Sequence, residues 1–92
     1  MATAVDIGTL ITKRPEMHGG KPCIAGRGIT VMTIVEMYEA DLSPEEIQAN
    51  WGDLSLESVF AALAYAAANR EEIDYWFRVD QEAHDELFGP SG

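Results

Sequence analysis

Residues Gly19–Val31 read GGKPCIAGRGITV, a basic, glycine-rich segment that leads directly into an acidic run of predicted helices. Met1 to Thr30 carries a net charge of +2, from two acidic residues and four basic ones: Lys13, Arg14, Lys21 and Arg27. Val31 to Gly92 carries −12, from two basic and fourteen acidic residues. This asymmetry predicts two contact surfaces that meet different partners.

The bulk composition indicates one small domain. Its 92 residues carry a net charge of −10, which disfavours nonspecific binding to nucleic acid or anionic lipid over most of the surface. Cys23 is the only cysteine, which is typical of a reducing compartment and allows no disulfide within the chain. No apolar run approaches the ~20 residues that span a bilayer, and the first residues lack the features of a signal peptide. We therefore expect a soluble, cytoplasmic protein without membrane contact.

Turn signals and apolar patterns divide the chain into three parts. Residues 1–30 are predicted to form an N-terminal strand arm and a glycine-rich turn, with a short edge strand within Val5–Thr12 and extended pieces at Cys23–Ile24 and Ile29–Val31. Residues 31–69 hold three helical patterns, at Val31–Ala40, Pro44–Asn50 and from Leu56 onward. Residues 70–92 are predicted to form an acidic, aromatic C-terminal helix and tail.

Two serines mark predicted helix starts. Ser43 precedes Pro44 and lies three residues before Glu46, the spacing of a capping box, and Ser55 precedes the third helical pattern. Three helices joined by tight turns, with a short middle helix, are typical of a helix-turn-helix, although a three-helix bundle without a DNA role has the same outline. We predict a mainly α fold: a helix-turn-helix-like three-helix core with a short N-terminal β-strand arm and a C-terminal helical extension.

The third helix is poorly equipped to read DNA. Its predicted apolar face consists of Leu56, Val59, Phe60, Leu63 and Ala67, and Ile73, Trp76 and Phe77 continue this face past the polar residues 69–72. Its outward positions would then fall among Glu57, Ser58, Ala61, Ala62, Tyr65 and Asn69, a face without Lys or Arg before Arg70. Base readout relies mostly on Arg, Lys, Asn and Gln. The polar residues 69–72 are compatible with a break or with an exposed turn of one long helix.

The chain resembles the family catalogued as domain-of-unknown-function family 433. The resemblance covers about Leu10 to Ala67 and is carried by Ile11-Thr12, Pro15, Gly19-Gly20-Lys21-Pro22-Cys23-Ile24, Gly26, Ile29, Val31, Leu42-Ser43-Pro44-Glu45-Glu46-Ile47, Leu54 and Ala61-Ala62-Leu63-Ala64-Tyr65-Ala66. Members resemble helix-turn-helix proteins with an N-terminal strand arm, form dimers, and include antitoxins encoded beside toxins related to PIN-type ribonucleases. Here Ala25 replaces an arginine of the family pattern, and Arg27-Gly28 stands in place of a Thr-Arg pair.

Two sets of residues are candidate binding residues. Lys13, Arg14, Lys21 and Arg27 are the best candidates for DNA contact, and a basic edge that discourages strand aggregation is the alternative. An acidic C-terminal segment supplies candidate partner-binding residues, namely Tyr75, Trp76, Phe77, Leu87 and Phe88. Alternatively, Trp76 and Phe77 close the core or a dimer interface. Under the partner-binding interpretation, truncation after Asn69 would leave the three-helix unit folded.

Neither catalytic nor metal-binding residues are expected. His18, Cys23 and His84 are not spaced like metal ligands, and the Gly19-Gly20-Lys21 segment lacks the remaining residues of a phosphate-binding loop. No nucleophile and base can be paired from the sequence, so we predict a protein that is no enzyme and uses no cofactor.

The sequence and the resemblance together lead to one functional hypothesis. The chain is expected to be a homodimeric, antitoxin-type binding module whose acidic helical half sequesters a basic ribonuclease-like toxin, with weak DNA binding by the arm. A DNA-binding transcriptional regulator without a toxin partner is the first alternative. A purely structural dimer is the second.

Overall fold

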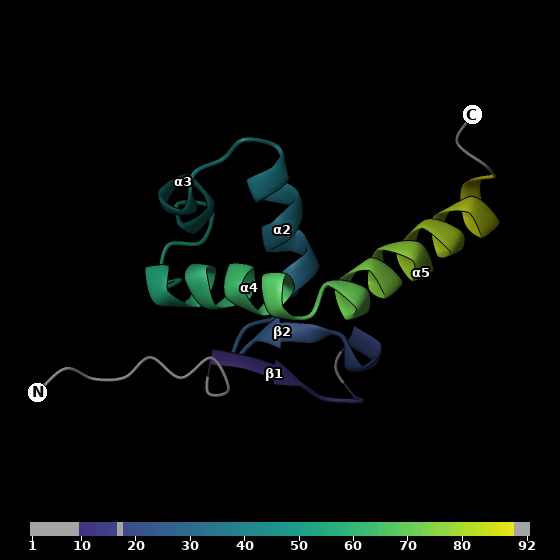
Figure 1. Cartoon of the computed structure of the whole chain (residues 1–92), viewed down its shortest axis with the longest axis horizontal. Coiled ribbons are helices and arrows are strands. Elements are labelled where there is room, and N and C mark those ends of the chain that lie inside the picture. Colours follow the sequence, from purple (N-terminus) through teal and green to yellow (C-terminus); the bar gives the residue numbers. More distant parts are fainter. Residues whose placement is uncertain (1–9, 17, 90–92) are drawn as a thin grey trace, which may run out of the picture.

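The computed structural model describes residues 10–16 and 18–89, a mainly helical chain with a short N-terminal hairpin (Figure 1). The elements follow in the order β1 (Ile11–Lys13), the 3-10 turn η1 (His18–Gly20), β2 (Pro22–Ile24), α2 (Val31–Glu39), α3 (Pro44–Gln48), α4 (Leu56–Ala68) and α5 (Arg70–Phe88). The predicted mainly α fold is therefore confirmed. Of the strand predicted within Val5–Thr12, residues 5–9 lie outside the described part of the chain.

The N-terminal hairpin is part of the core. Strands β1 and β2 pair antiparallel, with Ile11 opposite Ile24 and Lys13 opposite Pro22. All three residues of β2 are buried, and both strands contact α4 (Figure 1). The predicted extended piece Ile29–Val31 is wrong in one respect, because Val31 already begins α2. Thr30 bridges to Cys23 and caps α2 by accepting a hydrogen bond from the Thr33 amide.

Serine caps begin the next two helices, as the sequence predicts. The Ser43 hydroxyl accepts a hydrogen bond from the Glu46 amide at 3.2 Å, and the Glu46 carboxylate accepts one from the Ser43 amide at 2.8 Å. These reciprocal bonds make the complete capping box of α3 and lower the pKa of Glu46. Ser55 caps α4 by accepting from the Ser58 amide.

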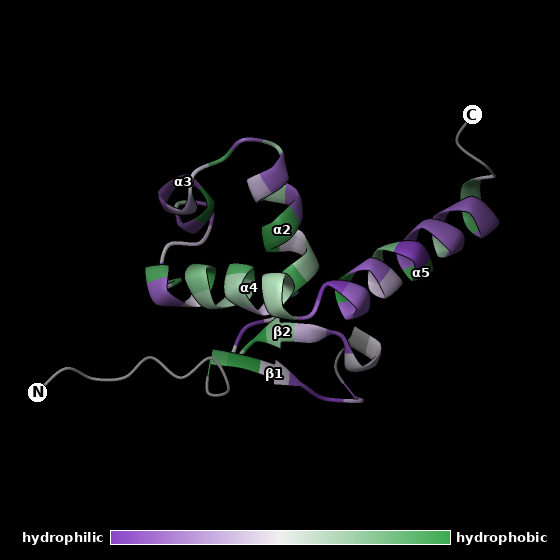
Figure 2. Ribbon diagram, viewed as in Figure 1, coloured by the Kyte–Doolittle hydropathy of each residue, from purple (hydrophilic) through white to green (hydrophobic). Residues whose placement is uncertain are grey.

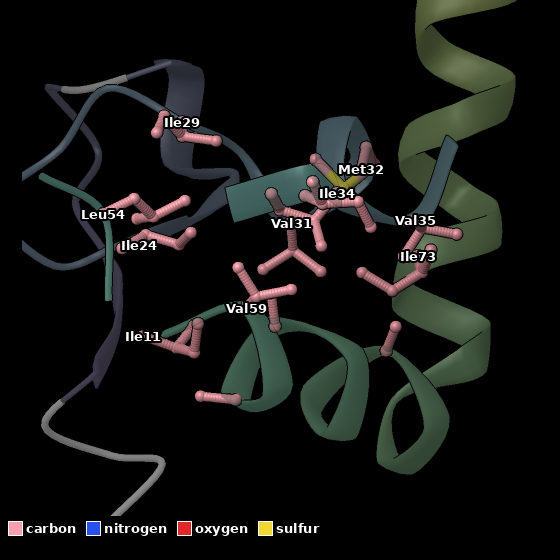
Figure 3. Close-up of a cluster of buried hydrophobic side chains, with 14 residues drawn as sticks. Ile11, Ile24, Ile29, Val31, Met32, Ile34, Val35, Leu54, Val59 and Ile73 are labelled. Atoms are coloured by element: carbon pink, nitrogen blue, oxygen red, sulfur yellow. The ribbon is translucent and has the colours of Figure 1, made fainter. Parts of the chain in front are cut away.

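The core lies where α2, α3 and α4 meet the hairpin. Ile24, Val31, Ile34, Ile47 and Val59 are almost completely buried there. Figure 3 shows Val31 of α2 pointing towards Val59 of α4, with Ile11 and Ile24 of the hairpin on the same side of the cluster. One continuous apolar cluster thus joins both strands to the helices.

The buried face of α4 differs from the predicted one. Ser58, Ala61 and Ala62 are buried, whereas the predicted core residue Phe60 is half exposed and Ala67 is exposed. The physical reason is that α4 is covered on two sides, by α2 and by the hairpin. Small side chains allow both neighbours to approach the helix closely, so the large Phe60 is displaced to the open side.

A break at Asn69 separates α4 from α5. Its backbone angles, φ −130° and ψ 47°, are not helical, so residues 69–72 do not continue one long helix. Ile73 of α5 is buried in the core and lies beside Val35 of α2 (Figure 3). From the sequence, we expect the residues up to Asn69 to fold without the rest of the chain. The structure does not support this expectation, because truncation after Asn69 would remove Ile73 from the core. Towards its C-terminal end α5 projects away from the body and is mostly hydrophilic (Figure 2).

The capping box makes a specific prediction about stability. Ser43→Ala should lower the free energy of unfolding by about 1 kcal/mol, because the Glu46 amide loses its acceptor. Ser43→Asp, which keeps a side-chain acceptor, should stay close to the wild type. Urea denaturation followed by circular dichroism measures both, and an unchanged midpoint for Ser43→Ala would contradict the role of the cap.

Candidate functional site

Two ion pairs join α5 to the hairpin region. Lys13 Nζ of β1 lies 2.9 Å from Glu72 Oε2, and Lys21 Nζ lies 2.6 Å from Asp80 Oδ1. The Lys21 ammonium also stands 5.7 Å from the centre of the Trp76 ring, within the range of a cation–π contact. Opposite charges from the two ends of the sequence thus hold the first half of α5 against the body.

Glu72 is the most heavily engaged carboxylate of this contact. It accepts a hydrogen bond from the Tyr65 hydroxyl of α4 as well as the ion pair from Lys13. Burial alone would raise the pKa of Glu72, but the bonds from Tyr65 and Lys13 outweigh it and hold the pKa below its usual value. The bond to Glu72 in turn raises the pKa of Lys13. Glu72 therefore ties α4, α5 and β1 together.

Arg27, another of the basic candidates, forms a separate ion pair on the surface. Arg27 Nη1 lies 2.5 Å from Asp53 Oδ1, which joins the loop after β2 to the loop before α4. The hydrogen bond and charge of Arg27 lower the pKa of Asp53. Since the Asp53 side chain is largely exposed, water screens this pair and its contribution to stability is small.

These pairs bear on the four candidate DNA-binding residues. Lys13, Lys21 and Arg27 each contact a carboxylate of the same chain, and a DNA phosphate would have to displace it. Arg14 is exposed and makes no ion pair within residues 10–16 and 18–89. Contact of these residues with DNA stays a prediction.

The five candidate partner-binding residues fall into two groups. Trp76 and Phe77 are partly buried against the core, which supports the core alternative for these two side chains. Tyr75, Leu87 and Phe88 are exposed, at 48%, 77% and 76% of their surface. Leu87 and Phe88 are the last two residues of α5, at the end of the helix that projects from the body (Figure 1).

The sequence patterns missed an apolar groove between α2 and α4. It has a volume of about 690 Å³ and is lined mainly by apolar and aromatic side chains, among them Val35, Tyr38, Pro44, Phe60, Leu63 and Ala67, and by the charged Glu39 and Arg70. Tyr38 and Phe60 are each about half exposed in it. The helical pattern assigned Phe60 and Leu63 to the core, so a signal existed, but the sequence could not show that a neighbour was lacking on this side.

The described residues hold no cluster of metal ligands, and their one cysteine is buried. They contain no group of three or more His, Cys, Asp or Glu side chains placed to hold a metal ion. Burial raises the pKa of the Cys23 thiol, which donates to the Lys21 carbonyl at 3.3 Å and is therefore a poor nucleophile. None of the helices over the described ranges is both long and apolar enough to cross a membrane.

The bonds that Glu72 makes with Tyr65 and Lys13 predict how much it contributes to stability. Glu72→Ala should lower the free energy of unfolding by about 2 kcal/mol, because both Tyr65 and Lys13 lose a charged partner. Glu82→Ala on the exposed part of the same helix is the matched control and should change it by less than about 0.5 kcal/mol. Thermal or urea unfolding measures both, and equal effects would contradict the assignment.

The lowered pKa of Glu72 also predicts a dependence on pH. A carboxyl group whose folded pKa lies below its unfolded value of 4.5 stabilises the fold fully above that value and loses the contribution as the pH falls through the folded pKa. The stability difference between the wild type and Glu72→Gln should therefore be constant near neutral pH and shrink below about pH 4.5. A difference that grows on acidification would refute this.

Comparisons with known proteins agree with the resemblance noted from the sequence. Residues 11–66 match the family model described as "Protein of unknown function (DUF433)". The crystal structure of a DUF433 member protein from Anabaena variabilis is similar, with a TM-score of 0.68 and 30% sequence identity over 75% of this chain and 68% of that chain. No match is found among curated proteins. The family model covers more than half of the sequence, and the chain therefore belongs to the DUF433 family.

Proposed function

We propose that the protein is an antitoxin-type binding module that sequesters a basic, ribonuclease-like toxin protein. The observation that carries this proposal is the projecting half of α5, where Leu87 and Phe88 are more than three-quarters exposed among acidic residues. Asp80, Glu82, Asp85 and Glu86 all precede these apolar side chains on the same helix. Exposed apolar side chains next to several carboxylates suit a partner surface that combines apolar pockets with positive charge.

The ion pairs explain which part of α5 is available. The stretch from Glu72 to Asp80 is held by Lys13, Lys21 and the packing of Trp76, so its inner face is already occupied. Residues 81–88 have exposed side chains except for the intermediate Asp85. We therefore place the partner contact on residues 81–88 together with Tyr75. The antitoxin role itself rests on the resemblance to family members encoded beside toxins.

The DNA-binding alternative has less support from the geometry. The exposed positions of α4 include Glu57, Phe60, Ala64, Ala67 and Ala68, none of which is basic. Three of the four basic candidates on the hairpin and its loops are paired with carboxylates. Weak, salt-sensitive contact through Arg14 and its neighbours is the form of DNA binding that this arrangement favours.

A binding experiment tests the toxin proposal. A small basic protein encoded beside this chain should be captured by the wild type and lose RNA-cleaving activity on binding. Leu87→Ala with Phe88→Ala should weaken capture about tenfold or more, because two exposed anchors are removed. Isothermal titration calorimetry measures the affinity.

Two controls sharpen this experiment. A chain ending at Asp80 should melt cooperatively, because it keeps Ile73 in the core and the partners of Lys13 and Lys21, yet it should fail to bind, because it lacks Leu87 and Phe88. Phe60→Ala removes an exposed aromatic side chain elsewhere and should bind the toxin normally. Full affinity of the Leu87→Ala, Phe88→Ala variant would overturn the assignment of this surface.

We also propose that the protein is a homodimer. A chain of this size buries only about 60–65% of the surface of its unfolded form, so a monomer has a marginal core. Sedimentation equilibrium at micromolar concentration should give twice the 10.1 kDa of one chain. A single species at the monomer mass would contradict the proposal.

A further inference from the structure

The groove between α2 and α4 is not filled by core side chains and is not part of the proposed toxin surface on α5. Its floor is apolar, and its two largest aromatic side chains, Tyr38 and Phe60, each expose about half of their surface. Monomeric proteins rarely leave a contiguous apolar surface of this kind without an interaction partner. The groove is formed by two packed helices, so its shape is fixed by the same contacts that hold the core.

The dimensions of the groove suit a helix. Phe60 and Ala67 lie two turns apart on α4, which corresponds to about 10 Å along the axis. Tyr38 and Val35 of α2 form the opposite wall. An amphipathic helix that places apolar side chains at i, i+3, i+4 and i+7 would fill a groove of this length with one face.

Exposed acidic side chains lie on both of the helices that form the groove. Glu39 lines it directly, Glu36 lies one turn before Glu39 on α2, and Glu57 lies one turn before Phe60 on α4. All three are exposed, and none forms an ion pair with another side chain over residues 10–16 and 18–89. Arg70 is the single basic side chain that lines the groove. These three carboxylates outnumber the one guanidinium, and this excess of negative charge favours Lys or Arg on the occupant.

A second copy of the chain fits these edges poorly. Face-to-face packing of two grooves would bring together three carboxylates from each copy, those of Glu36, Glu39 and Glu57, against one guanidinium from each copy, that of Arg70. The exposed end of α5 from another copy carries Glu82, Asp85 and Glu86, which would also meet carboxylates of the groove. Like charges placed together across an interface cost binding energy.

We propose that the α2–α4 groove is a docking site for an amphipathic helix of a partner protein, with an apolar stripe that packs on Phe60 and Tyr38 and with Lys or Arg flanking it. This site is separate from the proposed toxin surface on residues 81–88 and does not depend on it. The partner is recognised by helical shape, apolar contact and basic charge together.

Synthetic peptides test this proposal without knowledge of the natural partner. The probe is a fluorescent 18-residue helix with leucines on one face and lysines on the other, measured by fluorescence anisotropy at physiological ionic strength. A second probe has the same leucines with glutamates in place of the lysines. The full-length protein should bind the lysine probe saturably with one peptide per groove and should bind the glutamate probe much more weakly.

Variants separate the groove from general attraction to an acidic protein. Phe60→Ala should weaken binding of the lysine probe about tenfold, and Tyr38→Ala provides a second, independent removal of an exposed aromatic side chain. Leu87→Ala with Phe88→Ala is the matched control and should leave probe binding unchanged. Both groove residues are half exposed, so their replacement should preserve the cooperative melt.

A charge reversal tests the edges of the groove. Glu39 is the last residue of α2, and a positive charge at the C-terminal end of a helix interacts favourably with the helix dipole. The fold should therefore tolerate Glu39→Lys. Combined with Glu57→Lys, it should shift the preference from the lysine probe towards the glutamate probe. An unchanged preference would overturn the assigned role of the carboxylates.

Three further outcomes would overturn the proposal. Equal binding of both probes to the wild type would show that charge at the edges plays no part. Unchanged binding in both Phe60→Ala and Tyr38→Ala would show that the probe binds elsewhere. Self-association of the wild type that Phe60→Ala abolishes, measured by sedimentation equilibrium, would show that a second copy occupies the groove. Loss of toxin binding only in the Leu87→Ala, Phe88→Ala variant concerns the other surface and leaves this proposal intact.

Discussion

The position of α4 between α2 and the hairpin is the constraint on which the rest of the structure depends. Val59 and Ala62 are completely buried, and Ser58, Ala61 and Ala66 nearly so, because neighbours approach this helix from two sides. Only small side chains permit such close approach on adjacent faces. The large Phe60 is therefore left half exposed on the open side of α4, where it forms the wall of a groove together with the partly buried Leu63. The same packing that stabilises the domain thus creates its exposed apolar surface.

The charge asymmetry of the sequence is partly neutralised within the chain itself. The sequence predicts separate basic and acidic contact surfaces, yet Lys13, Lys21 and Arg27 of the basic part meet Glu72, Asp80 and Asp53 of the acidic part. Two of these pairs fix the direction of α5 against the hairpin. After the pairing, most of the remaining exposed charge is acidic, on α3, on the edges of the groove and on the end of α5. This distribution supports a basic protein partner more strongly than it supports DNA.

Local chemistry made much of the fold predictable from the sequence. Ser43, Pro44 and Glu46 define a helix start through side-chain and backbone bonds that need no distant neighbour, and the structure contains them as predicted. The break at Asn69 depends on how α5 meets α2, which no local pattern encodes, whereas the burial of Ile73 agrees with the apolar pattern that continues past residues 69–72. The face of α4 was misassigned for the same reason, because a helical period shows which residues share a side but not how many sides are covered. Among the candidate site residues, the sequence identified exposed Leu87 and Phe88 but could not separate them from Trp76 and Phe77, which the ion pairs of Lys13 and Lys21 bring against the body.

The two proposed surfaces, residues 81–88 and the α2–α4 groove, differ in how far their residues can be substituted without loss of the fold. Residues 81–88 extend beyond the ion pairs, so substitutions there leave the core contacts of Ile73 and the bonds of Glu72 intact. The groove is instead bounded by helices whose opposite sides are the core, and a change at Val35 or Ala66 would alter both packing and binding. Only its exposed members, Tyr38 and Phe60 above all, can vary independently of stability. A partner that contacts both surfaces would therefore gain specificity from a rigid groove and from a helix end whose sequence is free to change.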